Sequence, residues 1–197
     1  MQPLLIATRN PGKLLEIETL LGNMKLDLLS PNILGLSLQV EEIGSTYEEN
    51  AALKATEFAH ASGLVTMADD SGLEVDVLGG KPGIRSARFS PLPHATDANR
   101  RTHLLEELKD YPHPWIAHFH CTVAIATPEN KIYYAQGNCP GEIISTERGT
   151  NGFGYDPIFL IPAVGLTMAE LAMEQKNQLS HRARAIHAVL PILLTIL

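Results

Sequence analysis

Two adjacent carboxylates, Asp69 and Asp70, follow the apolar run 64–68 and are themselves followed by Ser71 and a glycine. Neighbouring residues of a strand point to opposite faces, so only one of the two aspartates can face a given site, and different roles are expected for them. A carboxylate at a strand end can bind a metal ion and orient or deprotonate a water molecule, while the Ser71 hydroxyl contacts a phosphate. The same residue types are common in turns, so this segment alone leaves both interpretations open.

The segment 8–13 is a candidate phosphate-binding loop. It lies between the apolar run 4–7 and a stretch of helical periodicity, so its free backbone amides, the Asn10 side chain and the Lys13 ammonium can bind a phosphate at a helix N-terminus. It is not a Walker A loop, because the first glycine is missing and Leu14 stands where a magnesium-binding hydroxyl is required. An ordinary polar turn is the alternative.

Further candidates are weaker when each is taken alone. Glu41 and Glu42 form a second carboxylate pair. Such a pair normally belongs to a solvated loop, and only a nearby metal ion would give it a binding role. Lys54 stands alone in a stretch of small residues on an expected helix, where a lysine is normally solvated.

The glycine-rich stretch 149–157 carries two aromatic rings, Phe153 and Tyr155, that can stack on a base. An aromatic residue between glycines is more often a packing anchor for its own loop. Lys176, His181 and Arg182, further along the chain, can donate hydrogen bonds to acceptor atoms of such a base.

The elements that must position these residues follow from hydrophobic periodicity and from turn and cap residues. The helix over 46–61 has Thr46 as its N-cap, Glu49 as its capping-box partner and Gly63 as its stop. Alternation of strand and helix together with a hairpin predicts an α/β domain with a mixed sheet. Strands are predicted at 4–7, 64–68, 73–78, 115–126, 132–136, 141–144 and 158–161, a surface loop at 79–93, and helices at 14–21, 46–61, 96–108, 167–174 and 178–197.

Composition favours one globular domain over residues 1–197, since 45% of the residues are hydrophobic and 19% are charged. A net charge of -7 argues against a broad nucleic-acid surface. The two cysteines, Cys121 and Cys139, form no CxxC pair, which excludes a zinc knuckle or disulfide framework and favours a reducing cytoplasm. No segment is long and apolar enough for a membrane span, and residues 1–7 predict an opening strand and not a signal peptide.

Six segments, in this order and over nearly the whole chain, resemble the inosine triphosphate pyrophosphatase family, also called Ham1-like proteins or non-canonical purine nucleoside triphosphatases. They are ATRNPGK (7–13), ENA (49–51) with KA (54–55), ADDSGL (68–73) with LGG (78–80), PGI (82–84) with SAR (86–88), GFGYDP (152–157) and SHR (180–182).

The resemblance implies a mixed central β-sheet flanked by helices, with two lobes around a nucleotide cleft. It implies an Mg²⁺-dependent hydrolase that cleaves ITP, dITP and XTP between the α and β phosphates, releases the monophosphate and pyrophosphate, and so removes deaminated purines from the nucleotide pool. A homodimer is also implied. The cytoplasmic location is predicted from the cysteine usage, and the absence of a nucleic-acid or membrane partner from the net charge and the lack of a long apolar segment.

Roles are carried over by motif. Asp70 resembles the general base, with Lys13 and Lys54 as catalytic phosphate ligands, and Asp70 and Glu41 as metal ligands. The substrate-binding residues implied are Thr8, Arg9, Asn10, Pro11, Gly12, Lys13, Lys54, Ser71, Phe153, Gly154, Tyr155, Asp156, Lys176, His181 and Arg182. Cationic donors such as Arg182 favour the C6 oxygen of hypoxanthine and xanthine over the amino group of adenine.

Some assignments stay open. Arg9 replaces a residue that is usually small in the family, and it either crowds the phosphate loop or adds a phosphate contact. Glu42 can serve as the metal ligand instead of Glu41. Two other functions compete: a Maf-type pyrophosphatase acting on modified nucleotides, against which the segments 153–156 and 180–182 argue, and a nucleotide-binding protein without catalytic activity.

Overall fold

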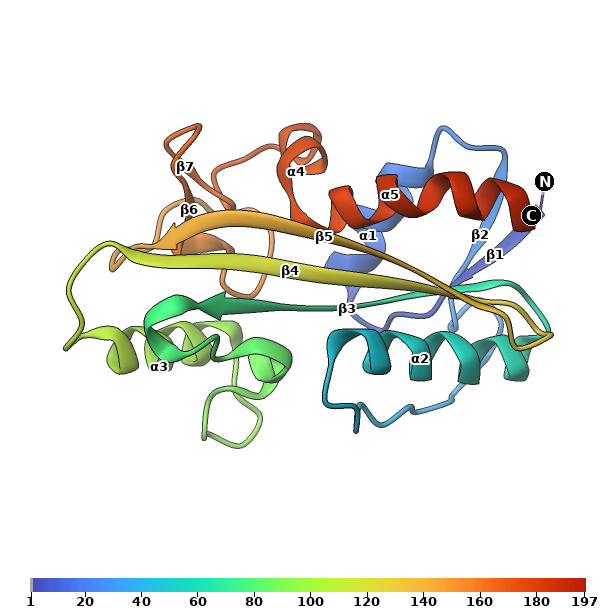
Figure 1. Ribbon diagram of the computed structural model, residues 1–197, viewed down its shortest axis with the longest axis horizontal. Helices are drawn as coiled ribbons and strands as arrows, with labels where there is room; N and C mark the ends of the chain where they lie inside the picture. The colour runs from blue at the N-terminus through green and yellow to red at the C-terminus, as the bar shows by residue number, and fades with distance from the viewer. Residues whose placement is uncertain (1) are drawn as a thin grey trace. The chain divides into compact units, whose positions relative to one another are not determined.

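The computed structural model describes residues 2–197, so Met1, the first residue of the predicted opening strand, lies outside the described residues. The strands are β1 (Gln2–Ile6), β2 (Leu26–Leu29), β3 (Thr66–Val75), β4 (Trp115–Ala126), β5 (Ile132–Ile143), β6 (Phe159–Ile161) and β7 (Leu166–Thr167) (Figure 1). The α-helices are α1 (Pro11–Leu21), α2 (Tyr47–Ser62), α3 (Asp97–Leu108), α4 (Met173–Leu179) and α5 (His181–Ile196), and the 3-10 helices are η1 (Asp76–Leu78), η2 (Gly83–Arg88) and η3 (Asp156–Ile158).

The strands form one mixed sheet in the order β2-β1-β3-β4-β5-β6-β7. β1 runs parallel to both β2 and β3, whereas β6 runs antiparallel to β5 and β7. The parallel part comes from the βα units of the N-terminal half, and the antiparallel part from the hairpins of the C-terminal half. The predicted α/β fold with a mixed sheet flanked by helices is confirmed.

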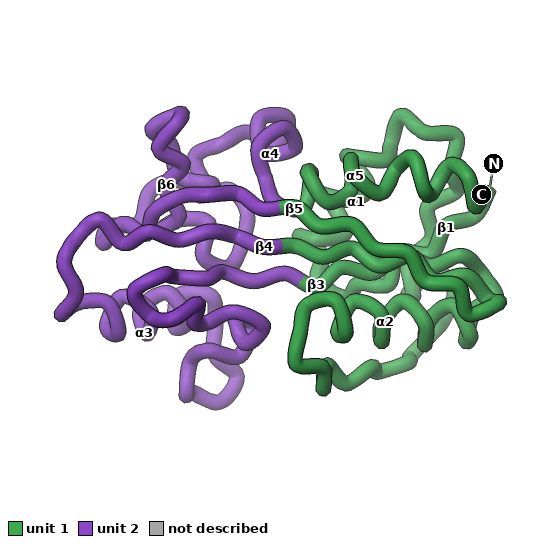
Figure 2. The backbone as a smooth tube through the Cα atoms, viewed as in Figure 1, with its two compact units in different colours: residues 1–70, 121–137, 182–197 green, residues 71–120, 138–181 purple. Residues whose placement is uncertain are grey.

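The chain divides into two compact units, coloured separately in Figure 2. The first unit comprises residues 1–70, 121–137 and 182–197, and the second comprises 71–120 and 138–181. Each unit has buried apolar clusters of its own.

In the first unit, alternation along the strands sends apolar side chains to two helical layers. Leu4 and Ile6 of β1 pack in one cluster with residues of α1 and α5. Leu5 and Ala7 pack in another with Ala51 and other residues of α2. Figure 1 shows α2 on one face of these strands and α1 and α5 on the other. Consecutive residues of a strand therefore face different helices, and this decides where Asp69 and Asp70 point.

In the second unit, one apolar cluster holds the elements around the glycine-rich loop. Leu104 and Leu108 of α3 are fully buried in it, together with Phe119 of β4 and Phe159 of β6. Trp115 is also buried there. The cluster makes α3 a rigid support, which matters below because α3 carries contacts to that loop.

The structure corrects the predicted course of two strands. β3 runs unbroken from Thr66 to Val75, so Asp69 and Asp70 lie inside a strand and not at its end. A buried strand can contain them because both carboxylates have hydrogen-bonded and charged partners. β5 likewise continues to Ile143, where a separate strand over 141–144 was predicted.

Other boundaries differ in the C-terminal region and around α1. The predicted helix over 167–174 is wrong, because Thr167 pairs with Leu160 in the sheet and α4 begins only at Met173. The helix α1 begins at Pro11, three residues earlier than predicted, because Asn10 is its N-cap. Part of the predicted loop 79–93 is the 3-10 helix η2. The helices α2 and α3 agree with prediction to within one residue.

Within residues 2–197, every helix is too short or too polar to cross a lipid bilayer.

Candidate active site

The first candidate segment, residues 8–13, forms the capped start of α1. The side chain of Asn10 accepts hydrogen bonds from the backbone N–H groups of Gly12 at 2.9 Å and Lys13 at 3.1 Å. Thr8 Oγ1 accepts from the N–H of Asn10 at 3.2 Å, and Pro11 occupies a first-turn position where no N–H is required. The backbone amides of Asn10, Gly12 and Lys13, which the sequence predicted to be free for phosphate binding, are therefore already hydrogen-bonded to side chains of the loop, and these bonds order the start of α1.

A buried ion network, defined here as Lys13, Glu16, Asp69 and Arg182, lies on the side of the first unit covered by α1 and α5. Lys13 Nζ and Arg182 Nε each lie 3.1 Å from Asp69 Oδ2, and the guanidinium also donates to Glu16. The Arg182 residue is only 1% exposed. Two positive and two negative charges balance, so the ions stay charged in the interior.

The charges of this network set its pKa values. Burial alone would raise the pKa of the Asp69 carboxyl, but Lys13, Arg182 and Lys54 outweigh burial and hold this pKa well below its usual range. Burial alone would lower the pKa of Arg182, but Asp69 and Glu16 raise it. Burial raises the pKa of the Cys121 thiol, whose Sγ lies 3.8 Å from Asp69 Oδ2, so the thiol stays protonated and can donate. Asp69 is therefore a fixed anion.

A second group, the carboxylate–lysine cluster, comprises Glu42, Asn50, Lys54 and Asp70. The Lys54 ammonium lies 2.7 Å from Glu42 Oε1, 2.7 Å from the backbone oxygen of Asp69 and 3.9 Å from Asp70 Oδ1. Asn50 and Lys54 are one helical turn apart on α2, so both reach the same stretch of β3. Lys54 is thus a paired lysine at a charged cluster and not a solvated helix residue.

Asn50 holds one oxygen of Asp70 in place. Its Oδ1 accepts from the N–H of Gly44 at 2.8 Å, and its Nδ2 donates to Asp70 Oδ2 at 3.1 Å. Asn50 is completely buried. Gly44 is required here, because a Cβ at this position would lie 2.7 Å from Asn50 Oδ1. The amide is therefore oriented from one side so that its donor faces the carboxylate.

The pKa values of Asp70 and its neighbour Asp69 are shifted in opposite directions. Burial raises the pKa of Asp70, and the negative charge of Glu42 adds to this, while Lys54, Lys13 and the Asn50 hydrogen bond only partly offset it. Burial alone would lower the pKa of Lys54, but Asp70, Asp69 and Glu42 raise it, so the lysine stays charged. A carboxylate with a raised pKa beside a fixed cation is typical of a general base.

The two candidate metal ligands differ in placement. Glu42 forms an ion pair with Lys54 and acts electrostatically on Asp70. Glu41, the preceding residue, is exposed. Of the two alternatives that the sequence left open, the structure brings Glu42 into the cluster.

Arg9 neither crowds the capped loop nor joins the cluster. Its guanidinium donates to the backbone oxygens of Ser37, at 3.0 Å, and Leu38. The side chain therefore ties the segment ahead of Glu41 to the start of α1.

The second unit holds the aromatic loop, defined as residues 149–157. Phe153 donates its N–H to Asp156 Oδ2 at 3.0 Å, and Lys176 Nζ lies 2.7 Å from the same oxygen. The Lys176 ammonium also lies 5.1 Å from the centre of the Phe153 ring. Gly152 must lack a side chain, since a Cβ there would lie 2.0 Å from Asp156. The loop thus presents a half-buried ring beside a buried cation.

The remaining residues predicted for substrate binding have other surroundings in the structure. Tyr155 is buried and its hydroxyl donates to the backbone oxygen of Ser86 at 2.9 Å, so it is a packing anchor. His181 is buried with its ring stacked on Phe119 at 4.7 Å. Ser71 is half-buried in β3, next to Asp70. Roles for these residues in substrate binding stay predictions.

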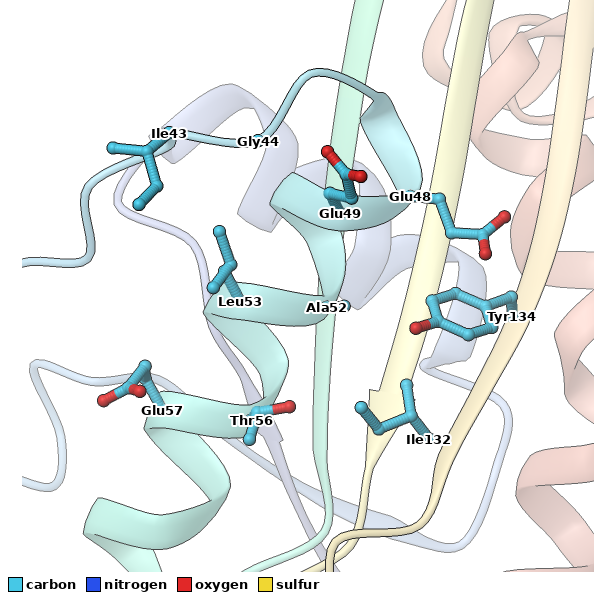
Figure 3. Close-up of a pocket in the computed structure, with 10 residues that line it drawn as sticks. All are labelled: Ile43, Gly44, Glu48, Glu49, Ala52, Leu53, Thr56, Glu57, Ile132 and Tyr134. Carbon is cyan, nitrogen blue, oxygen red and sulfur yellow. The ribbon is translucent and has the colours of Figure 1, made fainter.

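A separate pocket of about 500 Å³ lies against α2 and β5 in the first unit (Figure 3). Ile132 and Tyr134 line it from the strand, and Leu53 and Thr56 line it from the helix. Its lining contains three glutamates, no lysine or arginine, and none of the predicted site residues. A site for a triphosphate needs positive charge, so the carboxylate–lysine cluster and not this pocket is the candidate.

Comparison with known proteins shows the family to which the chain belongs. The Ham1 family model matches residues 4–192. The chain belongs to the Ham1 family. Members named dITP/XTP pyrophosphatase include those of Geobacter sulfurreducens, 47% identical over 94% of both chains, and of Listeria innocua, 44% identical over 94% of this chain and 92% of the relative.

Solved structures of Ham1 proteins share the fold. The Staphylococcus aureus Ham1 protein matches with a TM-score of 0.86 and 37% identity over the full length of both chains. A HAM1 protein from Coxiella burnetii matches with a TM-score of 0.89 and 36% identity over 99% of this chain and all of the other.

Several residues that organise the candidate site were not singled out from the sequence. Asn50 stands in one of the motif segments, but no spacing rule links it to Asp70. Glu16 had the appearance of a polar residue between apolar helix positions. Asp97 and Arg101, which contact the aromatic loop, lie on a helix whose periodicity reports only its buried face.

Proposed function

We propose that this protein hydrolyses non-canonical purine nucleoside triphosphates, ITP, dITP and XTP, to the nucleoside monophosphate and pyrophosphate. The observation that carries this proposal is the carboxylate–lysine cluster, in which Lys54 contacts Glu42, the Asp69 carbonyl and Asp70. The names of the Geobacter and Listeria relatives support the substrate class. In this proposal the enzyme removes deaminated purine nucleotides from the nucleotide pool.

Binding of the triphosphate is assigned to the first unit. Lys13 and Lys54 supply positive charge, and the residues Thr8 to Lys13 supply the capped N-terminus of α1. Both lysine side chains are already held by carboxylates, so they lose little conformational entropy when the triphosphate binds. They stabilise negative charge that develops on the phosphate oxygens during cleavage.

Asp70 is assigned as the general base. A water oxygen attacks the α phosphorus, the bond from this phosphorus to the bridging oxygen of the β phosphate breaks, and the electron pair leaves with pyrophosphate. The proton of the water passes to the Asp70 carboxylate. Asn50 keeps the carboxylate oriented through its 3.1 Å hydrogen bond.

The cluster fits a divalent cation. Its side chains carry two carboxylates and one ammonium, so a net negative charge of one remains, and the buried Asp70 lacks full charge compensation. Within residues 2–197 there is no set of three His, Cys, Asp or Glu side chains placed to hold a metal ion. Mg²⁺ typically takes one or two carboxylates and completes its shell with water and substrate phosphates. Bound by Asp70 and a glutamate, Mg²⁺ would neutralise phosphate charge and lower the pKa of a bound water.

Glu42, rather than Glu41, is expected to be the second metal ligand. Replacement of Glu42 by Gln should raise the Mg²⁺ concentration for half-maximal activity by about tenfold or more, because a charged oxygen ligand is lost. The matched change Glu41→Gln should leave it within about twofold, since Glu41 is exposed and outside the cluster. Pyrophosphate release over a magnesium titration measures both, and a larger effect at Glu41 would contradict the assignment.

Recognition of the base is assigned to Phe153, Lys176 and Asp156 of the second unit, with Gly154, Tyr155, His181 and Arg182 as further predicted contacts. The Phe153 ring can stack on a purine, and the ammonium at 5.1 Å can donate to an acceptor. Hypoxanthine and xanthine carry such an acceptor at C6. A buried donor mismatched against the adenine amino group costs about 1–3 kcal/mol, which gives roughly 10- to 100-fold discrimination.

One experiment tests the proposed function. Pyrophosphate release is measured with ITP, dITP, XTP, GTP and ATP, each with Mg²⁺ and with EDTA. Release confined to the deaminated purines and abolished by EDTA is the expected result. Saturable binding of dITP without pyrophosphate release would point instead to a nucleotide-binding protein, and activity only on modified pyrimidine nucleotides would point to a Maf-type enzyme.

A homodimer, a cytoplasmic location and a single functional domain over residues 1–197 belong to the same proposal. The homodimer rests on the resemblance to the family, the cytoplasmic location on the cysteine usage and the single domain on the composition. Light scattering that gives the mass of two chains would support the dimer, and the mass of one chain would contradict it.

A further inference from the structure

The backbone of Gly154 has both of its hydrogen-bonding groups directed out of the aromatic loop, to α3. Its N–H donates to Asp97 Oδ2 at 2.7 Å, and its carbonyl accepts from Arg101 Nη1 at 2.8 Å. Gly154 adopts a φ of +62°, a left-handed conformation that other residues rarely adopt. Two side chains outside the loop therefore form hydrogen bonds with the N–H and the carbonyl of Gly154.

The two partners are presented by a rigid helix. Asp97 and Arg101 are four residues apart at the start of α3 and so lie on one face. Thr96 and Asn99 cap this end reciprocally, and an acidic residue in the first turn is favoured by the helix dipole. The other end of α3 is anchored by the fully buried Leu108. The positions of the donor and the acceptor are therefore fixed before any ligand binds.

Arg101 also connects the loop to the chain that precedes it. Its Nε lies 2.8 Å from Glu147 Oε1 and its Nη2 lies 3.0 Å from Glu147 Oε2, a two-point contact that only a guanidinium makes. One side chain thus links Glu147, before the loop, with Gly154, inside it. Asp97 is similarly held by Arg100, and the Gly154 N–H and Arg100 keep the pKa of Asp97 low against the effect of burial.

What these contacts fix is the backbone next to Phe153. On one side, the N–H of Phe153 is bound to Asp156, whose carboxylate also binds Lys176. On the other side, Gly154 is bound to α3 through both backbone groups. The ring is half-buried, so packing alone does not determine its position.

We propose that Asp97 and Arg101 are positioning residues for purine recognition, which hold Gly154 so that the Phe153 ring and the Lys176 ammonium meet the base in a fixed geometry. This inference rests on the proposed function. Neither residue touches the base itself, so their loss affects how well the base is bound and discriminated, and not the binding of phosphate groups.

The test compares four variants with the wild-type protein. Asp97→Ala removes the acceptor, Arg101→Met removes the donors but keeps the aliphatic stem, and Arg101→Lys keeps one donor and the charge. The matched control is Lys109→Ala, which removes an exposed cation at the end of the same helix that forms an ion pair with Glu106. Calorimetry measures dissociation constants for dIMP and for pyrophosphate, and kinetics measure kcat/KM for dITP and dATP.

We expect the dIMP dissociation constant to rise about tenfold in Asp97→Ala and Arg101→Met, with a similar loss in the dITP to dATP ratio of kcat/KM. The pyrophosphate dissociation constant should change less than about twofold, and kcat at saturating dITP less than about threefold. Arg101→Lys should fall between wild type and Arg101→Met, and Lys109→Ala should match the wild type.

Other outcomes overturn the inference. Unchanged dIMP binding and selectivity in both Asp97→Ala and Arg101→Met would show that the contacts do not position the loop. Equal losses for dIMP and pyrophosphate, with a lower melting temperature, would show a general structural role. A wild-type protein that neither binds dIMP nor hydrolyses dITP would overturn the proposed function itself, and this outcome is distinguished by being seen before any variant is made.

Discussion

Replacement of Asp70 by Asn is expected to lower kcat for dITP by about a thousandfold, while the nucleotide dissociation constant changes less than about threefold. A general base contributes roughly 10²- to 10⁴-fold to rate, and an amide of the same shape cannot accept the proton of the attacking water. The amide can still present an oxygen to Asn50 Nδ2, which donates to Asp70 at 3.1 Å in the wild type. Steady-state kinetics and direct nucleotide binding check the two parts separately.

Folding stability should not suffer from this change. Burial raises the pKa of Asp70, which means that the charged carboxylate is held at a cost in the folded state. A neutral amide removes that cost, so the melting temperature of Asp70→Asn is expected to be equal to or above that of the wild type. Activity within twofold of the wild type would remove Asp70 from the role of general base.

The same substitution one residue earlier is the matched comparison. Asp69→Asn removes a charge that faces Lys13 and Arg182, and leaves both cations short of a partner in the interior. It is expected to lower the free energy of unfolding by about 3–5 kcal/mol, the usual cost of removing one partner from a buried ion pair. If Asp69→Asn were as stable as Asp70→Asn, the distinction between the two faces of β3 would be wrong.

This distinction was predictable from the sequence in kind but not in detail. Alternation along a strand predicts that two adjacent aspartates face different sides, and the structure confirms it. The turn-like composition of residues 69–72 suggested a strand end, whereas β3 continues to Val75. Turn propensity is a local preference, and here pairing with neighbouring strands and with charged partners overrides it.

Helices with clear cap residues could be predicted because caps depend on neighbouring residues. The C-terminal segment could not, because its pairing depends on a distant strand. Thr46 and Gly63 bracket α2 as expected, because cap residues act through contacts within a few positions. Leu166 and Thr167 instead pair with β6, a partner that becomes available only when the fold has formed. The helical pattern over 167–174 contained no sign of this pairing.

The charged partners of the site were also beyond the sequence. Lys54 was expected to be a solvated lysine unless a phosphate site existed, and its three oxygen contacts come from segments 12 to 16 residues away. Asn50, Arg101 and Glu16 have ordinary helical positions whose importance depends on what the opposite element presents. Motif resemblance supplied the residues that were found, and geometry supplied those that organise them.

Replacement of Arg182 by Ala is expected to lower the free energy of unfolding by about 3–5 kcal/mol. The change removes the donors that bind Asp69 and Glu16 and leaves both carboxylates in the interior, where Lys13 is still an ion-pair partner of Asp69. Arg184→Ala, an exposed arginine on the same helix, is the matched control and should cost less than about 0.5 kcal/mol. Denaturant unfolding at neutral pH measures both.

The stability difference between the wild type and Arg182→Ala should depend on pH because of the buried ion network. In the wild type the pKa of Asp69 is held below its usual range, so its stabilising contribution is complete above the unfolded value of about 3.9 and is lost as the pH falls. Without Arg182, Asp69 takes up a proton more readily and the cost of its burial shrinks in acid. The stability difference between wild type and Arg182→Ala should therefore be largest near pH 7 and smaller at about pH 4.

Arg182 was also predicted to favour the C6 oxygen of the base, and the same variant separates the two roles. The Nε and one Nη of its guanidinium already donate to carboxylates, so the fixed network predicts a loss of stability whatever the nucleotide. A narrower preference for ITP over ATP, measured as the ratio of kcat/KM values on the folded variant, would add a role in base selection. An unchanged ratio with the stability loss intact would assign Arg182 to holding Asp69, and through it Lys13, in place. A variant as stable as Arg184→Ala would contradict the buried network itself.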